Sequence, residues 1–307
     1  HLFVASTHSD LLFFTNRGRA FRIRAYEVPD AGRTAKGTNL VNLLPLDSDE
    51  KIEAVLSIKE DYDDGYLIMT TKQGLIKKTE LKEFKNIRRN GLIAISLKEG
   101  DELLKVKVTH GDAEIIIVTQ EGYAIRFSEQ DVRAMGRTAA GVKALTLRDG
   151  DIAVSMDIVV PDEELLVVSE NGYGKRTPMN EYGIQSRGGK GIKTYKITEK
   201  TGKLVGARVV KEDDELMLIN SNGIAIRINV SDISVTSRTT MGVRLMRTVD
   251  EEQIVALAKI PYSEDIEDND DESADKDMSI SEASYDEVEE NYDGDSEYNE
   301  NLEDMDE

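Results

Sequence analysis

The sequence predicts an all-β fold made of four-stranded units that repeat around a centre. Three observations predict it. Glycines recur at a nearly fixed period, short β-rich runs flank each of them, and no stretch has convincing helical periodicity. The glycines are Gly18, Gly74, Gly122, Gly172 and Gly223, spaced 56, 48, 50 and 51 residues apart. Repeats of this length are typical of solenoids, propellers and arrays, and radial repetition leaves few exposed sheet edges.

Each unit has the same order of elements. A β-rich run leads into a polar turn that ends in glycine, and a second strand leaves the turn. A short segment, a basic loop, a third strand and a fourth strand follow. In the third unit the four expected strands cover residues 114–118, 122–127, 142–145 and 152–156. Asn171-Gly172 and Asn222-Gly223 mark two of the turns as hairpins, because both residue types tolerate positive φ.

The basic loops share the frame Arg-x-x-x-Gly, which ends 19 residues after the turn glycine in each of its four copies. These copies begin at Arg33, Arg137, Arg187 and Arg238. A degenerate fifth copy places Arg88 and Arg89 before Gly91. Packing alone does not require an arginine at this position of every unit. The repetition therefore indicates a shared ligand.

The chemistry of these loops suits the phosphates of a nucleic-acid backbone. Glycines expose N–H donors and allow close approach, as in the box Gln185-Ser186-Arg187-Gly188-Gly189-Lys190-Gly191. Arginine can fork onto two phosphate oxygens, and lysine adds a point charge. For any single copy, a tight soluble turn is the alternative. The residues expected to bind DNA are Arg33, Lys36, Arg88, Arg89, Arg133, Arg137, Lys143, Gln185, Arg187, Gly188, Gly189, Lys190, Gly191, Lys193, Arg238 and Arg244.

A second series of cations lies four residues after each turn glycine. These side chains either belong to the same binding face or pair with nearby carboxylates. We expect roughly half of them to be paired. The series consists of Arg22, Lys78, Arg126, Arg176 and Arg227.

The charge of the chain is unevenly divided. The formal net charge is -21, but residues 262–307 hold 22 of the 60 acidic residues and one of the 39 basic ones. The rest of the chain is neutral and can bind DNA if its cations gather on one surface. We expect a folded domain over residues 1–260 and an acidic tail over 261–307 that is disordered for lack of apolar residues. We expect the tail to compete with DNA for the same cations, with a purely solubilising role as the alternative.

Composition argues against several other classes. The chain has no cysteine and three histidines, so disulfides, thiolate chemistry and a structural zinc site are not expected. Gly172-Tyr173-Gly174 lacks the third glycine and the helix of a dinucleotide site. We expect no catalytic residue, no metal and no cofactor. No apolar run reaches the roughly 18 residues of a membrane span. The chain opens without methionine in a strand-like run, which predicts a piece of a longer, cytoplasmic protein.

Several segments resemble the C-terminal domain of the bacterial DNA gyrase A family. They are the box at 185–191, the run Asn42-Leu43-Leu44-Pro45-Leu46, and the runs at 132–137 and 171–177. The family's box has Arg or Lys at its second position, where this chain has Ser186, and belongs to a first blade upstream of this chain. Over about residues 1–260, the resemblance implies a β-pinwheel. Such a pinwheel is a disc of about five to six four-stranded blades whose basic rim wraps DNA.

The resemblance also implies functions outside this chain. The parent enzyme uses ATP to introduce negative supercoils, with its strand-cleaving tyrosine in the N-terminal part of gyrase A and ATP hydrolysis in gyrase B. The expected partners are duplex DNA, gyrase B and a second copy of gyrase A in an A2B2 heterotetramer, and this chain alone is not expected to be an enzyme. The corresponding domain of topoisomerase IV is one alternative. A protein-interaction propeller is the other, although the chain has no tryptophan and its period exceeds the roughly 40–45 residues of Trp-Asp repeats.

Overall fold

Nineteen strands and six short 3₁₀ helices form the described part of the chain. The structure is a computed structural model that describes residues 5–32, 35–59, 62, 64–248 and 252–260. The described residues lie within one unit, His1–Tyr262. The expected acidic tail, 261–307, lies outside them, so its disorder stays a prediction.

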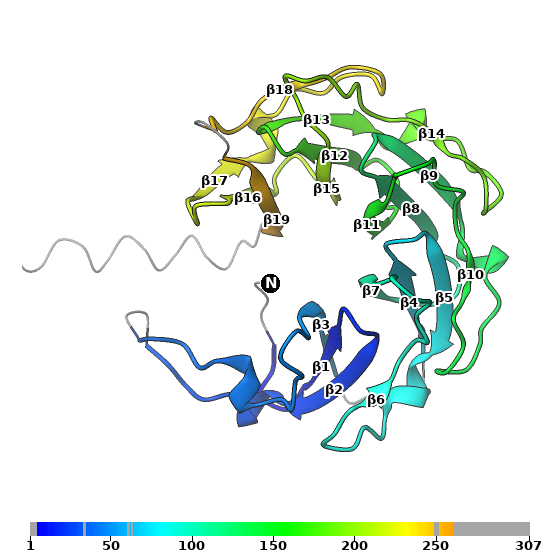
Figure 1. Ribbon diagram of the computed structural model, residues 1–307, viewed down its shortest axis with the longest axis vertical. Coiled ribbons are helices and arrows are strands. Elements are labelled where there is room, and N and C mark those ends of the chain that lie inside the picture. The colour runs from blue at the N-terminus through cyan, green and yellow to red at the C-terminus, as the bar shows by residue number, and fades with distance from the viewer. Residues whose placement is uncertain (1–4, 33–34, 60–61, 63, 249–251, 261–307) are drawn as a thin grey trace, which may run out of the picture. The chain divides into compact units, whose positions relative to one another are not determined.

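The strands form five antiparallel sheets, which are the blades of a propeller (Figure 1). Two consecutive strands form a hairpin in the middle of each blade: β1 (Asp10–Thr15) with β2 (Arg19–Arg24), β4 (Tyr66–Thr71) with β5 (Leu75–Glu80), β8 (Glu114–Thr119) with β9 (Tyr123–Ser128), β12 (Glu164–Ser169) with β13 (Tyr173–Pro178), and β16 (Glu215–Asn220) with β17 (Ala225–Asn229). The inner strands are β3 (Ile52–Ile58), β7 (Leu103–Thr109), β11 (Ala153–Ile158), β15 (Leu204–Val210) and β19 (Ile254–Ile260). The outer strands are β6 (Leu92–Ile93), β10 (Val142–Lys143), β14 (Ile192–Lys193) and β18 (Val243–Arg244).

The outer strand of each blade is supplied by the following repeat of the sequence. In the first blade, whose strand order is β3-β1-β2-β6, strand β6 comes from the second repeat and pairs Leu92 with Ala20. Strands β10, β14 and β18 join the second, third and fourth blades in the same way. The prediction of an all-β, propeller-like fold is therefore confirmed. The repeat and the blade are out of phase, however, which the spacing of the glycines did not reveal.

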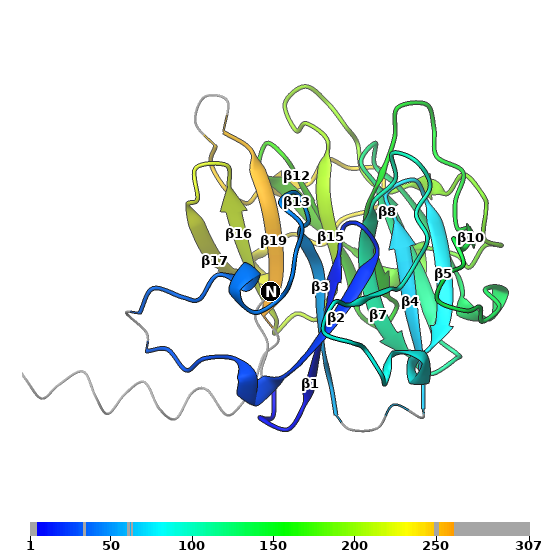
Figure 2. The ribbon, with the colours of Figure 1, turned by 60° about the horizontal axis from the view of Figure 1, so that its bottom comes forward.

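The blades follow one another in sequence order around the centre. Each inner strand contacts the next one, from β3 through β7, β11 and β15 to β19. Figure 2 shows β4, β5 and β7 of one blade running alongside each other. The fifth blade has three strands among the described residues, β17-β16-β19, and none of these residues pairs with the outer edge of β17.

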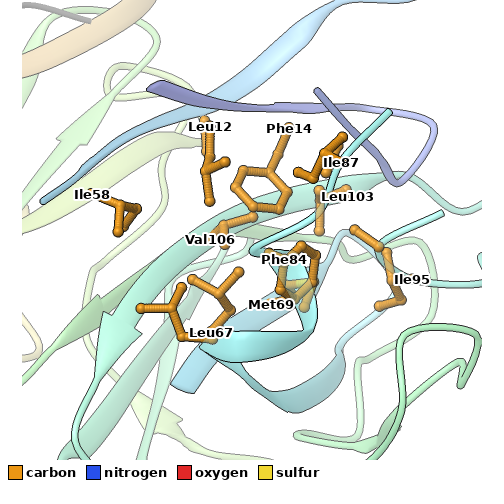
Figure 3. Packing of buried hydrophobic residues seen from close by; sticks show 14 of the residues in the cluster. Leu12, Phe14, Ile58, Leu67, Met69, Phe84, Ile87, Ile95, Leu103 and Val106 are labelled. Carbon is orange, nitrogen blue, oxygen red and sulfur yellow. The ribbon is translucent and has the colours of Figure 1, made fainter. Parts of the chain in front are cut away.

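Apolar layers between neighbouring blades form the core. Successive residues of a strand face opposite sides of its sheet, and here both sides are covered. Leu165 and Val167 of β12 join the layer shared with the third blade, whereas Leu166 and Val168 join the layer shared with the fifth. Figure 3 shows the layer between the first two blades, where Phe14 meets Phe84 edge-on at 6.0 Å. This double coverage explains why the first strand of each repeat is a continuous apolar run.

Short 3₁₀ helices follow the second strands and lead the chain to the outer edge. The absence of long helical periodicity in the sequence agrees with their length of three or four residues each. They are Ala25–Glu27, Leu40–Asn42, Leu81–Phe84, Glu129–Asp131, Met179–Glu181 and Val230–Asp232.

The glycines of the Arg-x-x-x-Gly frame are packing residues. Gly141 has a φ of 88°, and a Cβ atom there would lie 2.5 Å from the carbonyl oxygen of Ile76 in β5. Gly191 has a φ of 67°, and its Cβ would lie 2.6 Å from the carbonyl oxygen of Ala124 in β9. Only glycine lets the loop close this tightly onto the preceding blade. The fixed position of the glycine therefore follows from the fold, whether or not a ligand is bound.

We expect Gly141→Ala to lower the free energy of unfolding by at least about 2 kcal/mol, because it adds both backbone strain and a clash with a main-chain oxygen. Gly136→Ala is the matched control in the same loop, since a Cβ at Gly136 would meet nothing within 4 Å. Urea unfolding measures both variants. Equal stability of the two would contradict the packing role of Gly141.

Candidate nucleic-acid interface

The predicted basic loops project from the outer edges of the blades. On one side of the loop at 137–141, Ala134 forms a bridge with Lys78 of β5, and on the other side β10 pairs with the start of β5. The chain between these two attachments bulges away from the sheet. Ile184 and Val235 make the equivalent bridges before the loops at 187–191 and 238–242. Figure 1 shows the segments that lead into β10, β14 and β18 on the periphery.

Each loop is hydrogen-bonded to the segment that follows the outer strand of the preceding loop. Ser96 donates from its N–H to the oxygen of Ala139 (3.2 Å) and from its Oγ to the oxygen of Thr138 (2.7 Å). Thr146 donates in the same way to Gly189 (2.8 Å) and Gly188 (2.7 Å). The N–H of Lys196 donates to Thr240 at 3.1 Å. The loops on blades one to four thus form one connected series along a single rim.

The arginines that open the loops partly serve to brace this rim. Arg187 donates from Nε to the oxygen of Asp131 and from Nη1 to the oxygen of Lys143, both at 2.9 Å. Nε of Arg238 lies 3.6 Å from Glu181, and Nε of Arg137 lies 3.6 Å from Glu83. The side chains of Arg137 and Arg238 remain 36% and 32% exposed. Each arginine therefore fixes its loop and keeps part of its surface for a ligand.

Exposed cations stand beside these braced arginines. The second residue of the outer strand is Lys143 on the second blade, Lys193 on the third and Arg244 on the fourth. On the first blade this position is Ile93, which is 54% exposed. Tyr173 holds Arg244 by accepting hydrogen bonds from Nε and Nη2 at 3.2 and 2.7 Å. The other predicted cations that are exposed on the four edges are Arg88, Arg89, Arg133 and Lys190.

The box at 185–191 uses part of its predicted donor set within the fold. The N–H of Gly188 donates to the oxygen of Ala144 at 2.6 Å, and that of Gln185 donates to Arg126 at 2.7 Å. Gly189 packs near Ile125, since a Cβ there would lie 3.5 Å from its Cδ1. Lys190 is exposed, and its carbonyl oxygen accepts a hydrogen bond from Arg148 at 2.9 Å. Side chains, rather than free loop N–H groups, are thus the main donors that this loop offers.

The first copy of the frame is not brought to a described blade edge. Arg33 lies outside the described residues. Lys36 is exposed, in a stretch from residue 28 to 39 whose described residues form no strand. The structure therefore gathers the later copies and leaves this one apart.

The cations that follow the turn glycines by four residues are all paired with carboxylates of their own blade or its neighbour. The expectation that only half would pair is wrong. Each lies opposite an acidic residue at the start of the first strand or in a neighbouring helix, so the pairing is a feature of the repeat. The pairs are Arg22 with Asp10 (3.4 Å), Lys78 with Glu129 (3.2 Å), Arg126 with Glu114 (2.5 Å), Arg176 with Glu164 (2.7 Å), and Arg227 with Glu215.

Two buried lysines beneath the loops were not predicted from the sequence. Nζ of Lys77 donates to the oxygen of Ala94 (2.6 Å) and to that of Arg137, and Nζ of Lys175 donates to the oxygens of Ser237 (2.5 Å) and Arg238 (2.7 Å). Both residues are 0% exposed. Burial lowers the pKa of each ammonium group from 10.5 to about 8. A lysine three residues after a turn glycine was the available signal.

These two lysines make stability depend on pH. Between the folded pKa of about 8 and the unfolded value of 10.5, the unfolded chain binds more protons, so the free energy of unfolding rises with pH. We expect the wild type to gain about 2 kcal/mol per lysine between roughly pH 7.5 and 9.5 relative to the Lys77→Ile/Lys175→Ile variant. Urea unfolding at both pH values measures this difference, and identical pH slopes would contradict it.

Comparison with known proteins agrees with this architecture. The family model described as "DNA gyrase C-terminal domain, beta-propeller" matches residues 9–59, 65–110, 113–159, 163–211 and 214–261. The five matched segments follow the five repeats. This chain belongs to the DNA gyrase C-terminal domain family.

Curated relatives and solved structures support the same assignment. The chain is 59% identical over 275 residues to the DNA gyrase A protein of Clostridium acetobutylicum and 58% identical over 270 residues to that of Halalkalibacterium halodurans. It spans 89% and 88% of its own length in these matches, but only 33% and 32% of the relatives. A DNA gyrase A C-terminal domain structure has a TM-score of 0.73 at 32% identity, covering 84% of each chain. The C-terminal domain of DNA topoisomerase IV has a TM-score of 0.76 at 30% identity, covering 82% of this chain and 79% of that one.

Two further features are absent from the residues that the structure describes. No helix among them has the length and apolar character to cross a bilayer. No three or more His, Cys, Asp or Glu side chains among them are grouped so that they could hold a metal ion.

Proposed function

We propose that this chain binds duplex DNA along the outer rim of its blades and bends it, with little preference for sequence. The observation that carries this proposal is the connected series of basic loops on the edges of successive blades. Arg137, Arg187 and Arg238 fix the loops, and the exposed cations beside them reach the phosphates. Contacts to the DNA backbone position a duplex but carry little base information.

Several loops acting together are needed to bend DNA. Smooth bending by 40–90° over a short site costs on the order of 1–6 kcal/mol. A single loop with one or two phosphate contacts cannot offset this cost, whereas four neighbouring loops can share it. This is a physical reason for repeating the same basic loop on each blade.

The proposed role of the longer protein follows from the relatives. We propose that the chain is the DNA-wrapping part of a gyrase A protein, which works with gyrase B in an A2B2 assembly in the cytoplasm. In that assembly a wrap of one hand would present a DNA segment for ATP-dependent negative supercoiling. The strand-cleaving and ATP-hydrolysing residues would lie outside this chain, which then has no catalytic activity of its own. The higher identity to gyrase relatives favours this over a topoisomerase IV protein.

Salt dependence tests the proposal directly. Fluorescence anisotropy with a labelled duplex should show that log K falls linearly with log salt, by about 0.9 per phosphate neutralised. Two duplexes of unrelated sequence should bind equally well. No binding at low salt, or a slope near zero, would overturn the proposal and would favour a protein-interaction propeller.

A further inference from the structure

Lys77 and Lys175 occupy the same position in two alternate blades. Each lies in the second strand, three residues after the turn glycine, where the first, third and fifth blades have Phe21, Ile125 and Ile226. The apolar residues at this position need no polar partner. A lysine there places an ammonium group inside the blade, which costs free energy unless the group is hydrogen-bonded.

The partners of both ammonium groups are carbonyl oxygens of the rim. Each group donates to the oxygen of the loop arginine, Arg137 or Arg238, and to one further main-chain oxygen. Neither has a hydrogen-bonded carboxylate among the described residues. The positive charge is therefore not neutralised locally, and it lies one peptide group below the residue that faces the DNA in the proposed complex.

We propose that Lys77 and Lys175 are buried cations of the DNA-binding rim that position the loops of Arg137 and Arg238 and add their own charge to the attraction of the bound phosphates. This inference rests on the proposed function and names two residues that act from beneath the loops. They are positioning residues, because the loop lies between them and any ligand on the rim.

Proton linkage is the measurable consequence. In the free protein burial lowers the pKa of both lysines to about 8. The charge of Arg137 also lowers the pKa of Lys77, whereas for Lys175 Glu181 raises it and Arg238 lowers it. The ring of Tyr195, 6.0 Å from Nζ of Lys175, is the other group that faces it. A bound phosphate favours the charged form and raises both pKa values.

The sign of the effect follows from this shift. If the pKa is higher in the complex than in the free protein, the complex binds more protons near pH 8. DNA affinity is then greatest below about pH 8 and falls by about tenfold as the pH rises to about 9. Binding at pH 8 takes up protons from the buffer.

The test compares three proteins. Lys77→Ile/Lys175→Ile installs the residue of the third blade at both positions. Lys105→Met is the matched control, because Lys105 also has a pKa lowered to about 8 by burial but lies on inner strand β7. Anisotropy at pH 7, 8 and 9 should show an affinity loss of about tenfold for wild type and the control. The double variant should bind about tenfold more weakly at pH 7 and respond little to pH.

Calorimetry keeps the proposal testable even if the double variant does not fold. Titration of wild type with duplex at pH 8 in Tris and in HEPES, whose ionisation enthalpies differ, should show uptake of about one proton. No uptake by wild type, or the same pH profile in the double variant, would overturn the inference. Absence of DNA binding by wild type at every pH would instead overturn the proposed function.

Discussion

Replacing Lys143, Lys193 and Arg244 together with alanine should weaken duplex binding by about a hundredfold at low salt. These three side chains occupy the same position on outer strands β10, β14 and β18 and lie on consecutive blades. If each contacts one phosphate, the slope of log K against log salt should fall by about 2.7. Anisotropy titrations at several salt concentrations measure both quantities.

The control for this triple variant removes cations elsewhere. Lys59 and Lys211 are exposed and follow inner strands β3 and β15, away from the outer edges. Lys59→Ala/Lys211→Ala should keep the wild-type salt slope. Equal losses in the rim variant and the control would mean that net charge, and not the rim, determines binding.

Deleting residues 262–307 should tighten duplex binding by about tenfold or more at low salt. The deleted segment carries 22 acidic residues and one lysine, which compete with DNA for the cations of a neutral domain. Screening weakens this competition, so the difference should vanish in about 1 M salt, where the Debye length is only about 3 Å.

A charge-neutral tail separates competition from simple bulk. Replacing the aspartates and glutamates of this segment with asparagine and glutamine keeps its length. That variant should bind DNA as tightly as the deletion. If either variant binds as the wild type does, the tail does not modulate binding and acts as a solubilising segment.

The glycine period and the apolar runs were sufficient to predict the fold. Each turn glycine and each first strand lies where the sequence predicted, because hairpin chemistry and two-sided burial leave local marks. The pairing of β6, β10, β14 and β18 with the preceding blade left no such mark. Two-residue strands have no periodicity, and their partners lie some 70 residues away, as in the pair Ala20 and Leu92.

The site was predictable only in part, because local sequence does not show what a cation touches. Lys143 and Lys193 are exposed on the rim as expected. Arg187 uses two donors on main-chain oxygens, which no spacing could have shown. Lys77 and Lys175 looked like ordinary strand cations, since only the folded loops reveal that they are covered.

The central claim is that a duplex touches the rim loops in series and bends around them. The measurement that tests it most directly is the linking number of relaxed circular DNA after closure by a nicking-closing enzyme in the presence of this chain. A wrap leaves a linking difference that grows with protein and is reduced in the Lys143→Ala/Lys193→Ala/Arg244→Ala variant. Saturating binding with no change in linking number would contradict the account.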